Sequence, residues 1–178
     1  EDSKGVTFGN NTFVGVSESG ITGRSTDNGS SFSSVNSNQS NHLNGVTFGN
    51  NTFVAVSSNR KTVRSTNDGS TWSYTNTPSP YRAFYGVTFG NNNFVAVGDS
   101  GKIVRSTDNG SSWNNSTSGI SSHLKGITFG NNTFVAVGQS GKILRSSDNG
   151  STWNIRNSGI STHLNGVTFG NNTFVAVG

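Results

Sequence analysis

Residues 86–98 of the chain read GVTFGNNNFVAVG, and this stretch decides the fold. Its first five residues alternate between glycine or threonine and a large apolar side chain, the pattern of a strand with one buried face. Asn91 and Asn92 follow, and asparagine tolerates the left-handed backbone conformation that a tight hairpin turn requires. The run from Asn93 to Gly98 then predicts a second strand that is buried on both faces. The stretch therefore predicts a β-hairpin.

The same unit continues through two more predicted strands. A turn at 99–101 precedes a third strand over 102–106, and a turn at 107–110 precedes a fourth over 111–115. Helical periodicity of 3.6 residues is absent, and turn-forming residues interrupt the chain every few positions. One unit thus predicts four short antiparallel strands.

This unit occurs four times in full and is followed by an incomplete fifth copy. Its first glycine recurs every 40 or 41 residues, at Gly5, Gly45, Gly86, Gly126 and Gly166. Repeats of this length, made of four strands, are typical of a β-propeller, whereas the coils of a β-solenoid, the alternative fold, are usually shorter and less hairpin-like. We predict an all-β chain with one repeat domain over 1–178. It is a β-propeller of four-stranded antiparallel blades, with four complete repeats (about 5–44, 45–85, 86–125 and 126–165) and an incomplete fifth (166–178).

The composition excludes several classes of protein. The 178 residues contain no cysteine, so neither a disulfide framework nor a thiolate metal site is expected. The net charge is +4, but the cations are spread along the chain, which favours solubility over a specific nucleic-acid surface. No apolar run approaches the ~18 residues of a membrane span. We expect no cofactor and no metal.

The turn before the fourth strand carries the most specific motif. Residues 106–113 read STDNGSSW, and equivalent octapeptides occupy 25–32, 65–72 and 146–153. This motif resembles the Asp-box (BNR) repeat of sialidase-like and photosystem II assembly-factor-like propellers. The resemblance implies a structural role for the motif residues, which are Asp27, Gly29, Phe32, Asn67, Gly69, Trp72, Asp108, Gly110, Trp113, Asp148, Gly150 and Trp153.

The motif also has a physical meaning of its own. An aspartate side chain accepts hydrogen bonds from backbone N–H groups of its own turn, glycine supplies a positive φ, and the aromatic ring packs between neighbouring blades. Two copies depart from the pattern. Phe32 stands where tryptophan is usual, and Asn67-Asp68 reverses the usual Asp-Asn order, so that Asn67 makes the turn more weakly.

Candidate ligand-binding residues lie where the repeated loops gather on one face of a propeller. The loop before the first strand holds a histidine in three copies, and in the remaining one it holds Ala83. The turn between the second and third strands adds polar groups on the same face. Together these could form shallow lectin-type sugar sites; alternatively, each imidazole only caps its loop by hydrogen bonding to the backbone. The candidates are His42, His123, His163, Glu18, Asp99 and Gln139.

The second copy breaks the repeat between Tyr74 and Tyr85. Pro78, Pro80, Tyr81, Arg82 and Phe84 replace the usual loop. An exposed aromatic loop with an arginine has the composition of a binding hot spot, so Tyr81 and Arg82 are further candidates. Relaxed selection on one copy would leave the same sequence.

A repeated arginine raises the question of catalysis. Arg24, Arg64, Arg105 and Arg145 precede the Asp-box motif. Sialidase-like enzymes hold a substrate carboxylate with three arginines, but from different motifs and beside a tyrosine nucleophile. Here the arginine is one repeated position, and its aliphatic stem is expected to cover the neighbouring blade. We therefore expect no catalytic residues and no enzyme activity.

The unfinished fifth repeat predicts self-association. The apolar run Phe174–Val177 would lie at the edge of a half-blade, and unprotected edge strands pair with other chains. Our expectation is thus a non-enzymatic, extracellular or secreted module for binding or assembly, with repeated equivalent sites for a possible glycan. The alternatives are an engineered or recently amplified scaffold without a ligand, and a structural protein assembled through the last blade.

Overall fold

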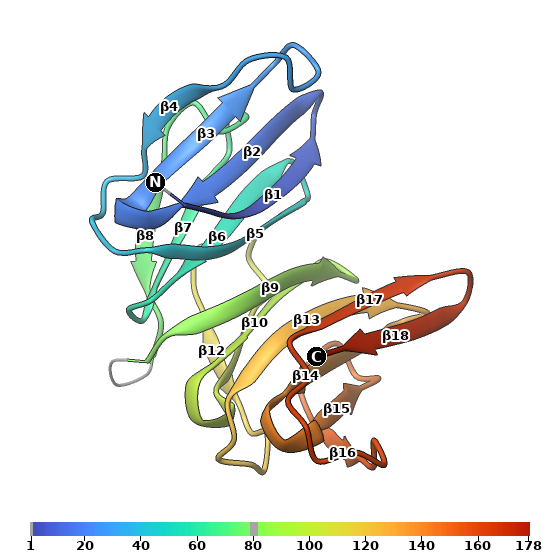
Figure 1. The fold of residues 1–178 in the computed structure, drawn as a ribbon. Coiled ribbons are helices and arrows are strands. Elements are labelled where there is room, and N and C mark those ends of the chain that lie inside the picture. The colour runs from blue at the N-terminus through green and yellow to red at the C-terminus, as the bar shows by residue number, and fades with distance from the viewer. Residues whose placement is uncertain (1, 79–81) are drawn as a thin grey trace.

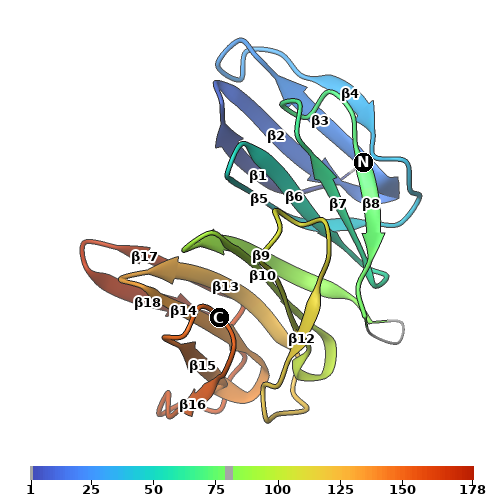
Figure 2. The same cartoon turned by 180° about the vertical axis from the view of Figure 1, so that it is seen from behind.

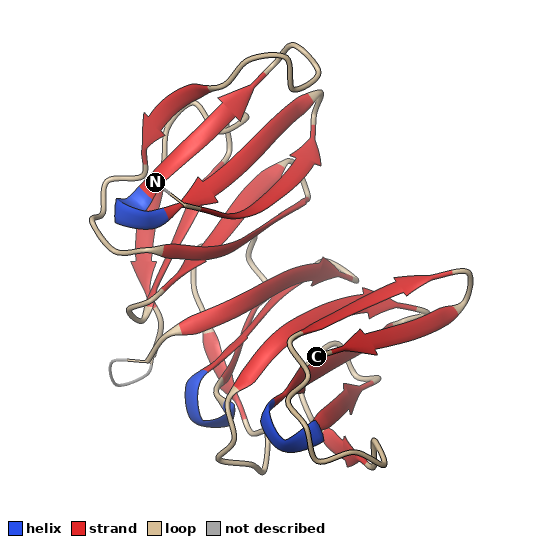
Figure 3. Cartoon of the chain, in the orientation of Figure 1, coloured by secondary structure: helices blue, strands red, loops and turns tan. Residues whose placement is uncertain are grey.

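The structure is a computed structural model that describes residues 2–78 and 82–178. Antiparallel β-sheets make up the described chain, with single 3₁₀ turns between some strands (Figure 3). Four four-stranded sheets and one two-stranded sheet follow one another around an arc, with the two chain ends on the outermost sheets (Figure 1). The predicted β-propeller architecture, with an incomplete fifth blade, is confirmed.

The strands of each blade follow in chain order, and each contacts the next through backbone hydrogen bonds. The blades are blade 1, with β1 (Ser3–Gly9), β2 (Thr12–Ser17), β3 (Ile21–Ser25) and β4 (Ser33–Asn36); blade 2, with β5 (Leu43–Gly49), β6 (Thr52–Ser57), β7 (Lys61–Ser65) and β8 (Ser73–Asn76); blade 3, with β9 (Phe84–Gly90), β10 (Asn93–Gly98), β11 (Ile103–Ser106) and β12 (Asn114–Ser116); blade 4, with β13 (Leu124–Gly130), β14 (Thr133–Gly138), β15 (Ile143–Ser146) and β16 (Asn154–Arg156); and the half-blade, with β17 (Gly166–Gly170) and β18 (Thr173–Val177). The 3₁₀ turns are η1 (Glu18–Gly20), η2 (Asp99–Gly101) and η3 (Gln139–Gly141).

The hairpin turns have the predicted chemistry. Asn91 and Asn92 both adopt left-handed backbone angles, with φ of 45° and 60°, and the asparagine pair of every other repeat does the same. Such turns match the right-handed twist of the strands they join. The sequence pattern therefore predicted both the hairpins and the left-handed backbone of their turns.

Two strand boundaries of blade 3 differ from the prediction by more than one residue. The first strand of blade 3 begins at Phe84, because a bulge at Tyr85 lets Phe84 pair with Gly98. The fourth strand begins only at Asn114. Residues 111–113 stay in the turn because the Asp108 carboxylate holds Ser112 through both its backbone N–H and its hydroxyl.

The hydrophobic core lies between blades rather than inside them. Val54 and Val56 of β6 pack against Phe94, Val104 and Trp113 of the next blade. The same arrangement joins blade 1 to blade 2, blade 3 to blade 4, and blade 4 to the half-blade. The first strands of successive blades also contact one another along the inside of the arc (Figure 2). We call each of these contacts a blade junction.

Each junction also fits an aromatic ring onto a glycine. A Cβ atom placed on Gly90 would lie 2.2 Å from the Phe129 ring of the next blade, so only glycine leaves room for that ring. Gly9, Gly49 and Gly130 receive the rings of Phe48, Phe89 and Phe169 in the same way. The glycine that closes each first strand is therefore a packing position.

Candidate functional site

The turn that resembles an Asp box, called the Asp-box turn below, is held by hydrogen bonds to one carboxylate. Asp108 Oδ1 accepts from Ser106 Oγ at 2.8 Å and from Ser112 N at 2.9 Å, and Oδ2 accepts from Ser112 Oγ at 2.6 Å. Gly110, at φ 77°, donates its N–H to Ser106 Oγ. Asp27 and Asp148 hold their turns in the same way.

These hydrogen bonds change the acidity of the carboxylates. The Ser31 hydroxyl, with Ser25 and the Ser31 N–H, lowers the pKa of Asp27 to about 2. At Asp148, burial opposes the shift, but hydrogen bonds from Thr152 and Ser146 outweigh it and lower the pKa to about 2. The pKa of Asp108 is lowered by the same balance of burial against hydrogen bonds. Charge-assisted hydrogen bonds to the ionised form account for the direction of all three shifts.

The reversed Asn67-Asp68 pair in blade 2 still closes its own turn and still bonds to a neighbouring blade. Asn67 Oδ1 accepts from Ser65 Oγ and Thr71 N, as the aspartate does elsewhere, while its amide donates to Thr71 Oγ1. Asp68 occupies the left-handed position and accepts from Asn10 of blade 1 at 3.0 Å. The exchange therefore moves the charge from inside the turn to the junction.

The aromatic residue of the motif lies in the junction with the preceding blade. Trp72, Trp113 and Trp153 are buried there, whereas Phe32 of blade 1 is 53% exposed. The glycine of the motif is likewise packed against the preceding blade in blade 3 but open in blade 1. A Cβ on Gly110 would lie 3.0 Å from Val54 of the preceding blade, while a Cβ on Gly29 would meet nothing within 4 Å. The motif therefore joins blades as well as closing its own hairpin.

In the first three copies, the repeated arginine contacts the Asp-box turn of the next blade. Arg24 Nε donates to the Asp68 carbonyl of the next blade at 2.6 Å, and Arg64 Nε donates to the Asn109 carbonyl at 3.0 Å. Arg105 Nη1 reaches Ser151 Oγ at 3.2 Å, whereas Arg145 donates to Thr133 within its own blade. Three of the four arginines thus bridge junctions, and each lies in a different blade.

The three candidate histidines also bridge junctions. The Nδ1 atoms of His42, His123 and His163 accept the backbone N–H of Ser19, Ser100 and Ser140 at 3.4, 3.0 and 3.3 Å. Each serine belongs to the 3₁₀ turn of the preceding blade and has a positive φ. His42 and His163 are exposed and His123 is half-buried. The rings therefore cap the turn of a neighbouring blade, and no two of them share one site.

The polar candidates have different partners in different blades. Glu18 forms an ion pair with Lys4 at 3.1 Å, and that lysine lowers the pKa of the Glu18 carboxyl. Gln139 accepts the backbone N–H of His123 at 3.2 Å. Asp99 accepts from Tyr85 Oη at 2.6 Å and from the N–H of Ala83 at 3.2 Å, and it lies 3.2 Å from His123 Nδ1. Equivalent positions thus bear different chemistry.

The Asp99 cluster contains two residues that sequence reasoning did not select. Tyr85 lies under Lys125, whose Nζ is 3.9 Å from the ring centroid. Burial, together with the hydrogen bond to Asp99, raises the pKa of Tyr85 to about 12, so the phenol stays neutral. Both residues occupy the position before the repeat's first glycine, where the copies read Lys4, Asn44, Tyr85, Lys125 and Asn165. That variability was the signal that could have identified them.

The exceptional loop of the second copy is only partly as predicted. Arg82 is exposed, and its Nη1 donates to Ser100 Oγ at 3.1 Å. Tyr81 and Pro80 lie outside the described residues. Phe84 was expected in the exposed loop, and this is wrong: it is fully buried in the junction of blades 2 and 3. It takes the place of Leu43 and Leu124 in their junctions, which explains why this position is apolar in each of these copies.

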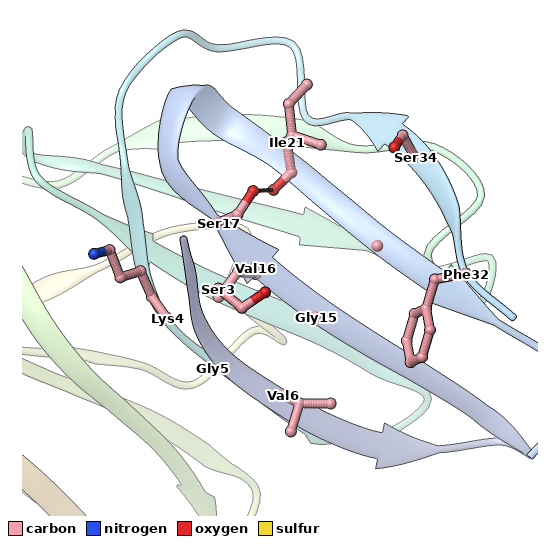
Figure 4. Close-up of a pocket in the computed structure, with 11 residues that line it drawn as sticks. Ser3, Lys4, Gly5, Val6, Gly15, Val16, Ser17, Ile21, Phe32 and Ser34 are labelled. Carbon is pink, nitrogen blue, oxygen red and sulfur yellow. Dashed lines mark hydrogen bonds between the residues drawn. The ribbon is translucent and has the colours of Figure 1, made fainter. Parts of the chain in front are cut away.

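A hollow of about 700 Å³ lies on the open face of blade 1 (Figure 4). Gly15 and Gly23 are among the residues that line it, and the Phe32 and Val6 side chains stand at its rim. Blades 2, 3 and 4 have Ala55, Ala96 and Ala136 where blade 1 has Gly15, and Val63, Val104 and Leu144 where it has Gly23. The smaller residues of blade 1 therefore deepen this face.

Other classes of site receive no support in the described part of the chain. Within residues 2–78 and 82–178, no three histidine, aspartate or glutamate side chains gather as metal ligands would. The same residues contain no helix that is long and apolar enough to cross a membrane.

Comparisons with known proteins support the fold alone. No family model matches the chain, and no curated protein sequence matches it. Among solved structures, YCF48 bound to a D1 peptide is 17% identical with a TM-score of 0.73, over 93% of this chain and 56% of that one. The computationally designed Ika8 protein is 14% identical with a TM-score of 0.77, over 99% and 55%. An ancestral GH74 enzyme is 21% identical with a TM-score of 0.68, over 85% and 23%.

These neighbours place the chain among propellers of different uses. The chain spans about 55% of the YCF48 and Ika8 chains that it matches. The names given to these proteins cover a peptide-bound protein, a designed protein and an enzyme, so the shared architecture does not select a function.

Proposed function

We propose that the chain is a non-enzymatic binding and assembly module that works outside the cell and presents equivalent weak sites along its rim. The supporting observation is the threefold recurrence of one arrangement, a surface imidazole seated on the 3₁₀ turn of the preceding blade. An imidazole beside a polar turn offers a sugar a ring face for its C–H groups and hydrogen-bonding groups for its hydroxyls. Sites repeated along one arc gain affinity through their number.

The distribution of ionisable groups favours a non-enzymatic module. The repeated arginines lie one per blade, and three of them donate to a neighbouring turn. The phenol of Tyr85 donates to Asp99 and has a raised pKa, which disfavours it as a nucleophile. A scaffold without a ligand is the alternative, and the recurrence of nearly identical blades favours it equally.

The test of glycan binding distinguishes the role of the imidazole ring in sugar binding from its role in capping the turn. We would probe a glycan array with the natural chain and with the triple variant His42→Asn, His123→Asn and His163→Asn. Asparagine keeps an oxygen to accept the serine N–H but removes the ring, so the fold should persist. We expect binding of the natural chain and its loss in the triple variant.

The copy that lacks the imidazole provides a matched control. Ala83→His would place a fourth ring at the junction of blades 2 and 3, and avidity should rise. No binding of the unsubstituted chain to any glycan would refute the sugar-binding role and leave the scaffold alternative. Self-association through the half-blade is the assembly part of this proposal.

A further inference from the structure

The two ends of the arc present the two halves of one junction. Within each filled junction, a pair of valines from the second strand packs against the next blade, as Val54 and Val56 do against blade 3. The equivalent pair in the half-blade, Val175 and Val177, is 51% and 61% exposed. On blade 1 the surface that would receive such a pair is exposed as well. It includes Val6 at 64%, Phe8 at 51% and Phe32 at 53%.

The two partners of the glycine contacts seen in each junction are also found unpaired at the two ends of the arc. Gly90 receives the Phe129 ring of the next blade, but a Cβ on Gly170 of the half-blade would meet nothing within 4 Å, and Phe8 has no glycine beneath it. Gly110 packs on Val54 of the preceding blade, but Gly29 of blade 1 has open space. Each vacancy at one end therefore corresponds to an exposed group at the other.

A polar contact repeats the same relation. In blades 1, 2 and 3, the first asparagine of the hairpin donates to the left-handed residue of the next blade's Asp-box turn, as Asn50 Nδ2 does to Asn109 Oδ1 at 3.2 Å and Asn91 Nδ2 does to Asn149 Oδ1 at 3.0 Å. In that series, Asn171 of the half-blade would pair with Asn28 of blade 1. Both residues are exposed and already have left-handed backbones.

From this correspondence we infer that polypeptides of residues 1–178 associate head to tail, with the half-blade of one copy docked on the open face of blade 1 of the next. Val175 and Val177 enter the hollow of Figure 4, Phe8 covers Gly170, and Asn171 bonds to Asn28. The interface continues the blade junctions of the fold across two chains. The inference deepens the assembly part of the proposed function, because it names the partner surface. It is a contact between different faces, so it builds rings or open filaments rather than a closed twofold dimer.

Blade 1 explains why this junction is weaker than those within the chain. Gly15, Gly23 and Phe32 stand where the other complete blades have alanine, valine or leucine, and tryptophan. Less apolar surface is therefore buried when the valine pair docks, and association is reversible and dependent on concentration.

Two blocked variants test the polarity of the contact. Val175→Glu with Val177→Glu disables the half-blade face, and Val6→Glu with Phe32→Glu disables the blade 1 face. All four side chains are exposed, so each variant should fold, which circular dichroism checks. In analytical ultracentrifugation the natural chain should form oligomers, and either variant alone should associate at least ~100-fold more weakly, because it would bury unpaired carboxylates.

Mixing the two variants is the decisive measurement. Each keeps one intact face, so an equimolar mixture should give a one-to-one dimer and nothing larger. If the variant with the blade 1 face disabled still self-associates, the half-blades pair edge to edge and the inference is wrong. A monomeric natural chain at high micromolar concentration would refute it as well.

A disulfide trap checks the register. The chain has no cysteine, so every cross-link comes from introduced residues. Asn171→Cys is placed in the variant with the intact half-blade, and Asn28→Cys in the variant with the intact blade 1 face. The two should cross-link when they are mixed under oxidation. Asn50→Cys with Asn109→Cys inside one chain is the positive control. Asn10→Cys is the matched negative control, because Asn10 already bonds to Asp68. Failure of the trap with a working positive control would contradict this register. Glycan binding by either blocked variant is independent of these outcomes, so the two proposals can fail separately.

Discussion

Strands β14 and β18 contain the same five residues, Thr-Phe-Val-Ala-Val, in different surroundings. In β14 all five are buried, because blade 3 covers one face and the half-blade covers the other. In β18 only Phe174 and Ala176 pack against blade 4, and Val175 and Val177 are exposed. Burial of a blade therefore depends on its neighbours, and the stability of the arc is close to a sum over junctions. Filled junctions and open faces should therefore respond differently to the same kind of substitution.

The largest effect is expected where an aromatic ring fills a junction. Trp113→Ala should lower the free energy of unfolding by ~3–5 kcal/mol, because it empties a buried site between blades 2 and 3. Phe32→Ala, at the equivalent open position, should cost less than ~1 kcal/mol. Urea unfolding of both variants at low protein concentration measures the difference. Equal losses would contradict the comparison.

Two glycines provide the next contrast. Gly90→Ala should cost ~1–3 kcal/mol, because its methyl group would collide with the Phe129 ring. Gly170→Ala should stay within ~0.5 kcal/mol of the natural chain, because its Cβ meets nothing in the same chain. Thermal unfolding distinguishes the two. A neutral Gly90→Ala would show that the ring moves aside at little cost.

The open face can also be changed toward a filled one. Gly15→Ala with Phe32→Trp restores residues of the other blades, and a Cβ on Gly15 has ordinary contact distances. Head-to-tail association should tighten about tenfold, because the docking face gains apolar area. Sedimentation equilibrium gives the change, and monomer stability should barely move.

The histidine that caps a neighbouring turn should have a smaller effect. His123→Ala should cost ~1 kcal/mol, since the Ser100 N–H loses its acceptor. His123→Asn should recover part of that loss by offering an oxygen. The natural Ala83 shows that the fold tolerates one copy without the ring. Denaturant midpoints of the two variants would show whether the capping bond or the ring itself matters.

The smallest effect is the acid response of the Asp-box turns. The folded-state pKa values of Asp27, Asp108 and Asp148 lie below the ordinary 3.8, so these carboxylates stabilise the fold above about pH 4. That contribution is lost as the pH falls toward about 2, the pKa of Asp27 and Asp148. Replacing all three by asparagine, as at Asn67 in blade 2, should flatten the stability profile in this range. An unchanged profile would show that other groups govern the acid response.

Local features of the fold could be predicted from the sequence. The alternation in 86–90, the asparagine pairs and the Asp-box turns all act within a few residues, so one repeat contains the information for its own hairpins. The repeat spacing then indicated the propeller. Even the misplaced start of the fourth strand has a local cause, the reach of the Asp108 side chain to Ser112.

The sequence predicted that the Asp-box aromatic and the arginine stem contact a neighbouring blade, but it did not predict which residues meet there, because the junctions join residues about one repeat apart whose copies are nearly interchangeable. The sequence marked Phe84 only as an aromatic in an irregular loop, and the packing of blades 2 and 3 placed it in the core. The same holds for the glycines beneath aromatic rings and for the hydrogen bond that Arg24 donates to the carbonyl of Asp68. The chain by itself determined what each blade is; the way neighbouring blades stack decided which faces are buried and which remain open, since burial is a property of two blades together.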